Sequence, residues 1–536
     1  MNKRISILIL CLISLGFTQC AKRGTPTGGE IDTIPPKFVR ASPENYSTNF
    51  KGNEIRIYFD EYIKLVKPQE QIIISPPLSP RPEITPLGNP QKYVRINITD
   101  TLQENTTYVV NFGNSVVDNN ENNPLPFFKY VFSTGSYIDS LTVTGSVNDA
   151  LLSEAEPFIS VMLYEMDENY NDSLVFQQPP RYITNTLDSL RTFELTNLKA
   201  GTYQLIAIKD RNNDFRYNPG REKIAFINEP VTVPSDTSYN LTLFRENPPF
   251  QTERPRQLNN NKLLIGYRGL INVDSLVFEP LGPVPGDFDY RITKVPNKDS
   301  IHFYFKPLIS ADTLLLRSVA HGRVDTLLTR ITKMPADTLQ ITTETAGNQE
   351  FGKGIIFSAN TPLTEVNSEL ISIIDRDSVN VNFTTELRSF ENVVHLKLAK
   401  AENQSYHVTA LPGAFRDFYN ATNDTIKKTF KTRAYSDYGN LNLNLLNVRS
   451  FPIIVQLTDE KGVVREEKYS TSTTNFRFEY LSPGKYLLRV IYDENENGVW
   501  DTGDYLRRRA PEEIIYFPEI IEVRQNWDDI QTFSLN

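Results

Sequence analysis

Two segments of this 536-residue chain repeat each other without a gap, and this repetition constrains the fold more than any other feature. In both copies an apolar run follows the repeated residues and ends in an acid, Asp210 or Asp493. The repetition therefore predicts two copies of one folding unit. A Phe, a Leu, a Gly and a Tyr carry it, at Phe193, Leu198, Gly201 and Tyr203 and, 283 residues later, at Phe476, Leu481, Gly484 and Tyr486.

A second pair of segments repeats with a spacing of 298 residues. Within the first copy, residues 55–59 and 93–98 alternate between apolar and polar, as half-buried strands do. The second copy matches less well upstream, where residues 354–358 stand in place of 55–59. The matching residues are Asn105, Tyr108, Phe132 and Thr134 in the first copy and Asn403, Tyr406, Phe430 and Thr432 in the second.

The composition favours strands over helices. The chain has 31 Phe, 26 Tyr and 34 Pro but only 4 Met, and aromatic residues suit pleated surfaces while proline suits turns. Hydrophobic residues at 39% and charged residues at 23% exclude wholesale disorder. The composition therefore predicts an all-β, multi-domain protein. The net charge of −9 gives no reason to expect nucleic-acid binding.

The chemistry-bearing residues are too sparse and too scattered for a recognisable catalytic site. No HExxH, GxSxG, Walker or GxGxxG motif is present. Asp60 and Glu61 are adjacent on a predicted strand, so they point to opposite faces and cannot easily flank one bond. We therefore predict that the chain is not an enzyme. The four histidines stand on different segments, at His302, His321, His395 and His407.

The N-terminus has the pattern of an export signal. Lys3 and Arg4 precede a short apolar run over residues 5–17, and Cys20 follows directly in a loose lipobox. We predict a lipoprotein signal peptide over residues 1–19, lipidation of Cys20, and a flexible tether over residues 20–33. The alternative is an ordinary cleavage site that lies near a cysteine by chance. No later apolar run is long enough to span a bilayer.

Three family resemblances add to this interpretation. The first repeat, with Ile34-Pro35-Pro36, Phe59-Asp60-Glu61 and Phe132-Ser133-Thr134, resembles the bacterial Ig-like domain of S-layer and other surface proteins. The Gly201-Thr202-Tyr203 segment resembles the transthyretin-like or carboxypeptidase-regulatory β-sandwich. Cys20 to Gly24, together with the motif that runs from Asp493 to Gly503, resembles Ig-like-domain outer-membrane lipoproteins of Bacteroidota.

Five modules follow from the repeats and the resemblances. We predict that modules 1 and 4 are an Ig-like domain and its diverged copy, that modules 2 and 5 are transthyretin-like β-sandwiches, and that module 3 is a linker with a β-sandwich connector. Their predicted ranges are 34–136 for module 1, 137–246 for module 2, 247–349 for module 3, 350–434 for module 4 and 435–536 for module 5.

The loop after residue 492 has the spacing of a calcium loop. Oxygen-bearing side chains fall where an EF-hand loop places its ligands, and Gly498 stands at the sharp turn. A strand precedes the loop, so it is not an EF-hand, and the alternative is a turn whose side chains bond their own backbone. The candidate Ca²⁺ ligands are Asp493, Asn495, Asn497, Asp501 and Asp504, with a weaker set at Asp210, Asn212, Asp214 and Asn218, where Phe215 replaces the glycine.

Aromatic residues near these loops are candidates for stacking on sugars: Trp500, Tyr505 and Trp527, with Tyr217 in the earlier loop. Such a site needs exposed rings, and the alternative is that the rings pack under their own loops. The basic run 507–509 is expected to be a solvated edge, or else to meet lipid head groups or a carboxylate cluster of a partner.

Two functions fit these features. The first is a non-catalytic envelope lipoprotein that acts as a structural or protein-interaction scaffold, as an accessory subunit of an outer-membrane complex. The second is a surface glycan-binding lipoprotein of a polysaccharide-uptake system. In both, the lipid anchor joins the protein to the outer membrane. Lys22 and Arg23 follow the cysteine in place of acids, which favours the periplasmic face over the cell surface.

Overall fold

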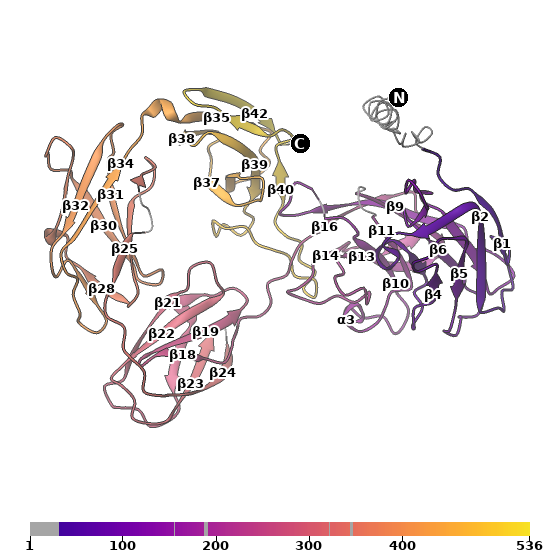
Figure 1. The fold of residues 1–536 in the computed structure, drawn as a ribbon, viewed down its shortest axis with the longest axis horizontal. Coiled ribbons are helices and arrows are strands. Elements are labelled where there is room, and N and C mark those ends of the chain that lie inside the picture. Colours follow the sequence, from indigo (N-terminus) through magenta and orange to yellow (C-terminus); the bar gives the residue numbers. More distant parts are fainter. Residues whose placement is uncertain (1–31, 155, 187–190, 321, 344–346, 536) are drawn as a thin grey trace, which may run out of the picture. The chain divides into compact units, whose positions relative to one another are not determined.

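The computed structural model describes residues 32–535 apart from residues 155, 187–190, 321 and 344–346. Strands dominate it, so the all-β prediction is confirmed (Figure 1). The described residues divide into two compact units, one from residues 32–142 with 181–186 and 195–200, and the other from the remaining described residues. In the part of the chain that the structure describes, no helix is long and apolar enough to cross a membrane.

Module 1 is a two-sheet sandwich. One sheet has the order β1-β2-β5-β4 with β7 beside β2, and the other has the order β3-β6-β8. Ile57 of β2 lies opposite Val94 of β5, and both side chains are fully buried because alternate residues of each strand face the core. Its elements are β1 (Phe38–Ser42), β2 (Glu54–Leu65), α2 (Pro68–Gln71), β3 (Ile73–Ser75), β4 (Glu83–Thr85), β5 (Gln91–Asn97), β6 (Thr107–Asn111), β7 (Val116–Asp118) and β8 (Lys129–Ser133).

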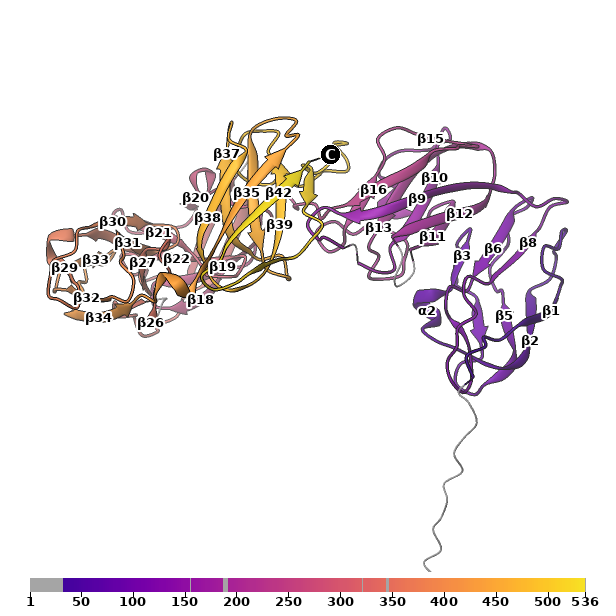
Figure 2. The same cartoon turned by 90° about the horizontal axis from the view of Figure 1, so that it is seen from above.

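Module 2 follows from β9 onward. Strand β13 pairs with β10, β14 and β15, and β16 lies parallel to β9. Figure 2 shows β9, β10, β13, β15 and β16 together in this module. Its elements are β9 (Leu141–Asp149), β10 (Ser160–Glu165), α3 (Leu174–Gln177), β11 (Tyr182–Asn185), β12 (Thr192–Leu198), β13 (Gly201–Ile208), β14 (Ile224–Phe226), β15 (Val231–Val233) and β16 (Ser238–Leu243).

Module 3 is a sandwich in its own right. Its sheets have the orders β17-β19-β22-β21, with β18 beside β19, and β20-β23-β24. Phe303 and Phe305 of β22 are fully buried between them. Its elements are β17 (Gln251–Thr252), β18 (Arg256–Asn259), β19 (Lys262–Arg268), the 3-10 helix η1 (Val273–Ser275), β20 (Val277–Pro280), β21 (Asp289–Lys294), β22 (Ser300–Lys306), β23 (Thr313–Ala320) and β24 (Arg323–Arg330).

Module 4 begins earlier than predicted. Strands β25 and β26 pair with β27 and β34, so the boundary predicted at residue 350 is wrong and these strands belong to module 4. The sheets have the orders β25-β27-β31-β30, β26-β34-β32-β29 and β28-β33. Its elements are β25 (Ile341–Thr343), β26 (Gly347–Asn348), β27 (Ile355–Ala359), β28 (Leu363–Val366), η2 (Ser368–Leu370), β29 (Ile371–Ile374), β30 (Phe383–Arg388), β31 (Val393–Leu398), β32 (Ser405–Ala410), β33 (Phe415–Asp417) and β34 (Ile426–Lys431).

Module 5 has the sheet orders β38-β35-β42 and β37-β36-β39-β40, with β41 beside β39. As in module 2, its last strand lies parallel to its first, since β42 pairs with β35 in parallel. Its elements are η3 (Tyr435–Asp437), β35 (Gly439–Leu446), β36 (Ile453–Thr458), β37 (Val464–Ser470), β38 (Asn475–Leu481), β39 (Gly484–Tyr492), β40 (Ile514–Tyr516), β41 (Ile521–Val523) and β42 (Asp528–Ser534).

The repeated residues of modules 1 and 4 make the same contacts. The Tyr108 hydroxyl accepts a hydrogen bond from the backbone of Gln103 at 2.9 Å, and the Tyr406 hydroxyl accepts one from Ala401 at 2.7 Å. The hydroxyls of Thr134 and Thr432 each accept from one backbone N–H and donate to one backbone carbonyl of the turn that precedes β6 or β32, and we call each of these turns a corner. Each corner lies 298 residues from its counterpart in the sequence, so the two copies fold alike here.

Candidate functional site

The repeated loops lie between β13 and β14 in module 2 and between β39 and β40 in module 5, and an acid opens each of them. Asp210 accepts hydrogen bonds from the backbone N–H groups of Asn212, Asn213 and Phe215 at 3.0, 2.7 and 2.8 Å. These bonds fold the chain tightly around one carboxylate. The Asp214 carboxylate accepts a hydrogen bond from the backbone N–H of Arg216 at 3.0 Å.

The second loop repeats this arrangement. The buried Asp493 carboxylate accepts from the backbone N–H groups of Asn497 at 3.2 Å and Gly498 at 2.8 Å. The side-chain amides of Asn495 and Asn497 both donate to Oδ2 of Asp501, each at 2.6 Å. Four of the five predicted calcium ligands are therefore brought together, and in this structure they bond one another and their own backbone.

Asp504, the fifth predicted ligand, contacts Arg507 instead of the other four. Its carboxylate accepts from the backbone of Arg507 at 3.0 Å and pairs with the Arg507 side chain at 3.5 Å. Among the described residues, no group of three or more His, Cys, Asp and Glu side chains is placed to hold a metal ion. Calcium binding by either loop stays a prediction.

Each loop is closed by a buried glutamate that the ligand pattern did not include. Glu222 accepts from the backbone of Arg211 at 3.0 Å and of Asn218 at 2.9 Å. Burial raises the pKa of Glu222, and the two N–H bonds oppose this shift. Its place in the sequence offers a signal, because it stands two residues before the apolar run that becomes β14.

Glu512 does the same in the second loop. It accepts from the backbone of Glu494 and of Asp501, both at 2.9 Å, and these are the positions that correspond to Arg211 and Asn218. Burial raises its pKa as well, against the same two N–H bonds. It too stands two residues before the next strand, β40. The two loops thus share one hydrogen-bond arrangement, with an acid at each end.

The two loops differ in length. Asp210 and Glu222 are 12 positions apart, whereas Asp493 and Glu512 are 19 positions apart, so the second loop has seven additional residues. They fall after Asp501, within a segment that we call the clasp loop, residues 502–509. This segment reaches from module 5 to module 2.

The clasp loop bonds the end of module 2 through its backbone and one hydroxyl. Thr502 donates from its hydroxyl to the carbonyl of Arg245 at 2.7 Å, and the backbone N–H of Tyr505 donates to Oε1 of Glu246 at 2.5 Å. The other oxygen of Glu246 accepts from the hydroxyl of Tyr217 at 2.8 Å. Glu246 therefore joins the first loop to the clasp loop.

Apolar packing supports these bonds. The Tyr505 side chain is 1% exposed, and its ring lies 5.4 Å from that of Phe226 and 6.1 Å from that of Phe176, edge to face in both cases. Gly503 lies against Phe244, because a Cβ at this position would stand 2.6 Å from the ring and 2.8 Å from the carbonyl of Arg509. Any larger residue at 503 would push the loop away.

Arg508 completes the contact. Its guanidinium makes a two-point ion pair with the Asp172 carboxylate, through Nε at 3.1 Å and through Nη2, and donates from Nη1 to Oε1 of Gln204 at 2.9 Å. Two-point pairs fix orientation as well as distance. The basic run 507–509 is therefore not only a solvated edge, since its middle residue bonds a carboxylate within this chain.

The three rings proposed for sugar stacking do not share an exposed face. Tyr505 is buried in the contact with module 2, so its ring is not available to a ligand in this structure. Trp500 lies half-buried over its own loop and donates from its indole nitrogen to the carbonyl of Glu512 at 3.0 Å. Trp527 is 60% exposed. Tyr217, named with them, is buried.

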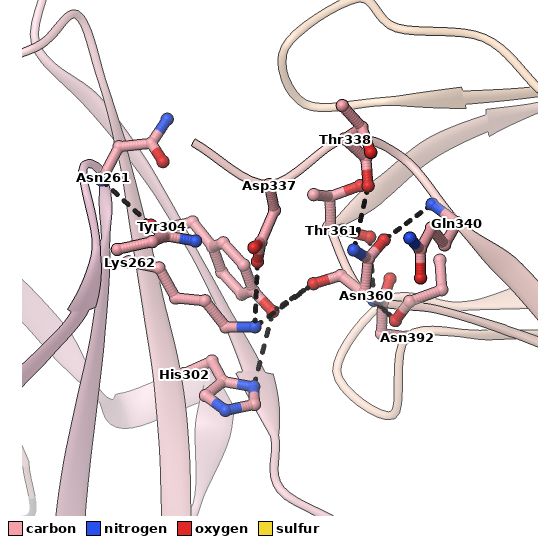
Figure 3. Close-up of polar contacts among 12 residues, drawn as sticks. Asn261, Lys262, His302, Tyr304, Asp337, Thr338, Gln340, Asn360, Thr361 and Asn392 are labelled. Atoms are coloured by element: carbon pink, nitrogen blue, oxygen red, sulfur yellow. Dashed lines mark hydrogen bonds and ion pairs between the residues drawn. The ribbon is translucent and has the colours of Figure 1, made fainter. Parts of the chain in front are cut away.

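A second polar contact between modules lies between modules 3 and 4 (Figure 3). The Tyr304 hydroxyl donates to the carbonyl of Asn360 at 3.0 Å and lies 3.4 Å from Nδ1 of His302. Lys262 pairs with Asp337 at 3.5 Å and donates to the same Asn360 carbonyl at 3.4 Å. We call this group of five residues the joint.

The environment of the joint suppresses the charge of its histidine. Burial, reinforced by the neighbouring Lys262, lowers the pKa of His302 to about 4, against the opposing effect of Asp337. His302 is therefore neutral at pH 7. His407 instead lies beside the Thr429 hydroxyl at 3.0 Å on another sheet, and His395 lies on β31. His321, Cys20 and the predicted signal peptide lie outside the described residues.

The comparisons with known proteins give one family match. The model of the bacterial Ig-like domain matches residues 32–134. No curated protein matches the chain. Domains 1–6 of the surface layer protein SbsC align with 91% of this chain and 67% of that chain, at 8% identity and a TM-score of 0.17.

Two further solved structures align with similar scores. The major pilin subunit BcpA of Bacillus cereus aligns with 74% of this chain and 99% of that chain, at 10% identity and a TM-score of 0.14. A three-domain Ig fragment of titin aligns with 57% of this chain and 100% of that chain, at 11% identity and a TM-score of 0.14. At these TM-scores the structural alignments carry no inference. Residues 32–134 are thus similar to the bacterial Ig-like domain family, as the sequence led us to expect for module 1.

Proposed function

We propose that this chain is a non-catalytic scaffold of the bacterial cell envelope, a lipoprotein that holds its β-sandwich modules in place and contacts partner proteins as an accessory subunit of an outer-membrane complex. The match of module 1 to the bacterial Ig-like domain supports a bacterial surface or envelope setting. Cys20, at the end of a short apolar run and before a small polar tether, supports the lipid anchor.

The clasp loop is the observation that carries the proposal. Module 2 shows that the loop can close with seven fewer residues, so the longer loop of module 5 is not needed to fold the sandwich. Its additional residues bond Glu246 and Asp172 of another module. A chain that fixes one module against another in this way is built to hold a defined arrangement, as a scaffold requires.

The ionisable side chains of the joint also support a structural role. Lys262, Tyr304 and His302, which carry groups that an active site would use, are engaged between modules 3 and 4. Their hydrogen bonds and ion pair go to one another, to Asp337 and to a backbone carbonyl of the neighbouring module. The geometry therefore supports a structural role for these residues.

Recovery of a partner tests the scaffold. We expect affinity purification of the tagged, lipidated protein from detergent-extracted membranes to recover the same envelope proteins in repeated preparations. Cys20→Ala is the matched control, because it removes the anchor and leaves every described residue unchanged. Recovery of the free monomer alone from the wild-type protein would argue against the proposal.

The membrane face is tested on intact cells. Lys22 and Arg23 directly after the cysteine support the periplasmic face. We therefore expect protease added to whole cells to leave the chain intact, and protease added after permeabilisation of the outer membrane to cut it. Digestion in intact cells would place the protein on the surface and contradict this part of the proposal.

A further inference from the structure

Module 4 contains a cavity of about 450 Å³ that no feature of the scaffold uses. It lies over the β25-β27-β31-β30 sheet and beside the segment 351–354, which leads into β27. A volume of this size suits a small organic ligand. The residues that give it chemical character are Lys353, Gly354, Ile356, Arg388, His395 and Lys397.

The register of the sheet explains why these side chains share one face. Ile356 of β27 lies opposite His395 of β31, which lies opposite Glu386 of β30. Side chains two positions along a strand point the same way, so Lys397 and Arg388 lie on this face too. The intervening residues, such as Ile355 and Leu396, are buried in the module core.

The lining is cationic in a chain that is acidic overall. Three lining residues are Lys or Arg and none is Asp or Glu, while the whole chain has a net charge of −9. Glu386, which adjoins the cavity, pairs with Arg388 through Nε at 2.9 Å and with Lys397 at 2.5 Å. These two hydrogen bonds lower the pKa of Glu386 to about 2, so it stays ionised. One carboxylate thus faces two cations, which leaves one excess positive charge, while the third lining cation, Lys353, pairs with Glu350 at 2.5 Å.

These ion pairs are open to competition. The side chains of Arg388 and Lys397 are 46% and 58% exposed, and pairs at such exposure contribute little to stability. Arg388 bonds Glu386 through Nε, and its two terminal amino groups carry its remaining N–H donors. A phosphate or carboxylate that enters the cavity would gain charge-assisted bonds from both cations.

The segment 351–354, which forms one wall of the cavity, is fixed in place. The Phe351 ring packs on Tyr435 and Tyr480 of module 5, with ring centroids 4.8 Å apart in each case. Lys400 donates to the backbone carbonyls of Glu350 and Lys353 and so ties down both sides of this turn. Gly354 lets the segment lie close to β31, because a Cβ there would stand 3.0 Å from the carbonyl of Leu396.

We infer that this cavity binds a small anionic saccharide of sugar-phosphate size, with its phosphate between Arg388 and Lys397 and its ring against Phe351 and Ile356. An apolar wall beside a cationic one matches the two faces of such a ligand, since a sugar ring presents C–H groups and the phosphate presents charged oxygens. The inference goes beyond the scaffold role and does not depend on it.

Calorimetric titration of the full chain in detergent tests the site, with glucose 1-phosphate as the probe and glucose as the uncharged control. We expect saturable binding of glucose 1-phosphate and none of glucose. Arg388→Ala and Lys397→Ala should each weaken binding about tenfold, the value of one charge-assisted bond. Lys427→Ala, on an exposed position of β34 in the same module, should leave the affinity unchanged.

The variant Glu386→Gln distinguishes a direct effect on ligand binding from a loss of folded structure. Its carboxylate competes with the ligand for Arg388 and Lys397, so its removal should tighten binding by about threefold, whereas a general loss of structure would weaken it. The inference is overturned if glucose 1-phosphate does not bind, if glucose binds equally well, or if Glu386→Gln weakens binding as the alanine variants do.

Discussion

At the scale of the residue, the aspartates of the loops have carboxylate oxygens that could bind either a metal ion or the N–H groups of their own backbone. Asp118 accepts backbone N–H bonds from four successive residues, 120–123. Burial acts to raise the pKa of Asp118, but the four bonds prevail and lower it. Asp210 and Asp493 use their oxygens in the same way. The spacing of acids could be read from the sequence, but whether the oxygens face an ion or the backbone depends on how the turn closes.

His302 makes the stability of module 3 depend on pH. Its pKa is near 6.5 in the unfolded chain and about 4 in the folded one, so the unfolded state binds the proton more tightly. The stabilisation is complete above pH 6.5 and falls as the pH drops toward 4. After allowance for solvent screening we expect a loss of roughly 1–2 kcal/mol.

The loss is measured as the difference between wild type and His302→Gln in urea unfolding at pH 7 and pH 4.5. Glutamine does not titrate, so the variant should lose less stability than wild type over this range, while the carboxylates common to both cancel. Equal pH dependence in the two proteins would show that His302 does not titrate as described.

At the scale of the element, the loop between β39 and β40 has three side chains that converge on one point. Asn495 and Asn497 both aim their amide groups at one oxygen of Asp501, each at 2.6 Å. The amide oxygens of Asn495 and Asn497 accept from the backbone N–H groups of Asn497 at 3.1 Å and Val499 at 2.9 Å, so calcium binding requires both amides to turn and release these bonds. Two amide oxygens beside a carboxylate oxygen are a set that Ca²⁺ accepts.

We therefore expect 10 mM calcium to stabilise module 5 by roughly 1–3 kcal/mol, the linkage for a weak extracellular site. The readout is a rise in melting temperature that EDTA reverses. Asp501→Asn should abolish the rise, and Asp214→Asn, in the shorter loop, should not. A melting temperature that calcium leaves unchanged would rule the site out.

The loop between β39 and β40 also shows which features could be predicted from the sequence and which could not. The repeats and the alternating strands predicted the all-β modules, because core faces follow a period of two that the sequence displays directly. The seven extra residues of the second loop were visible too, but their role was not. Arg508 and its partner Asp172 are 336 positions apart, and a contact of that range leaves no periodic trace in a single sequence.

Hydrogen exchange tests the clasp loop locally. The Tyr505 N–H donates to Glu246, so its amide should exchange slowly in the native protein. Glu246→Ala removes the acceptor, and we expect a peptide that covers residues 502–509 to exchange faster by about tenfold or more. Glu229→Ala, at an exposed turn before β15, is the control. Fast exchange in the wild-type protein would mean that the loop is not held in solution.

At the scale of the whole molecule, the contacts between modules decide which parts unfold together. Modules 3 and 4 share the joint, in which Tyr304 and Lys262 both bond the Asn360 carbonyl. Modules 2 and 5 are far apart in the sequence but share the clasp loop, through Glu246 and Arg508. Domains in a string unfold independently unless such contacts couple them.

Loss of the clasp should therefore uncouple modules 2 and 5. Tyr505→Ala with Arg508→Ala removes a buried ring and a two-point ion pair, which together are worth roughly 2–4 kcal/mol of coupling. In scanning calorimetry we expect one transition of the wild-type protein to split into two. Arg507→Ala, whose side chain is 81% exposed, is the matched control and should leave the trace unchanged. Two independent transitions already present in wild type would show that the clasp does not couple the modules, and the scaffold would then be a flexible string.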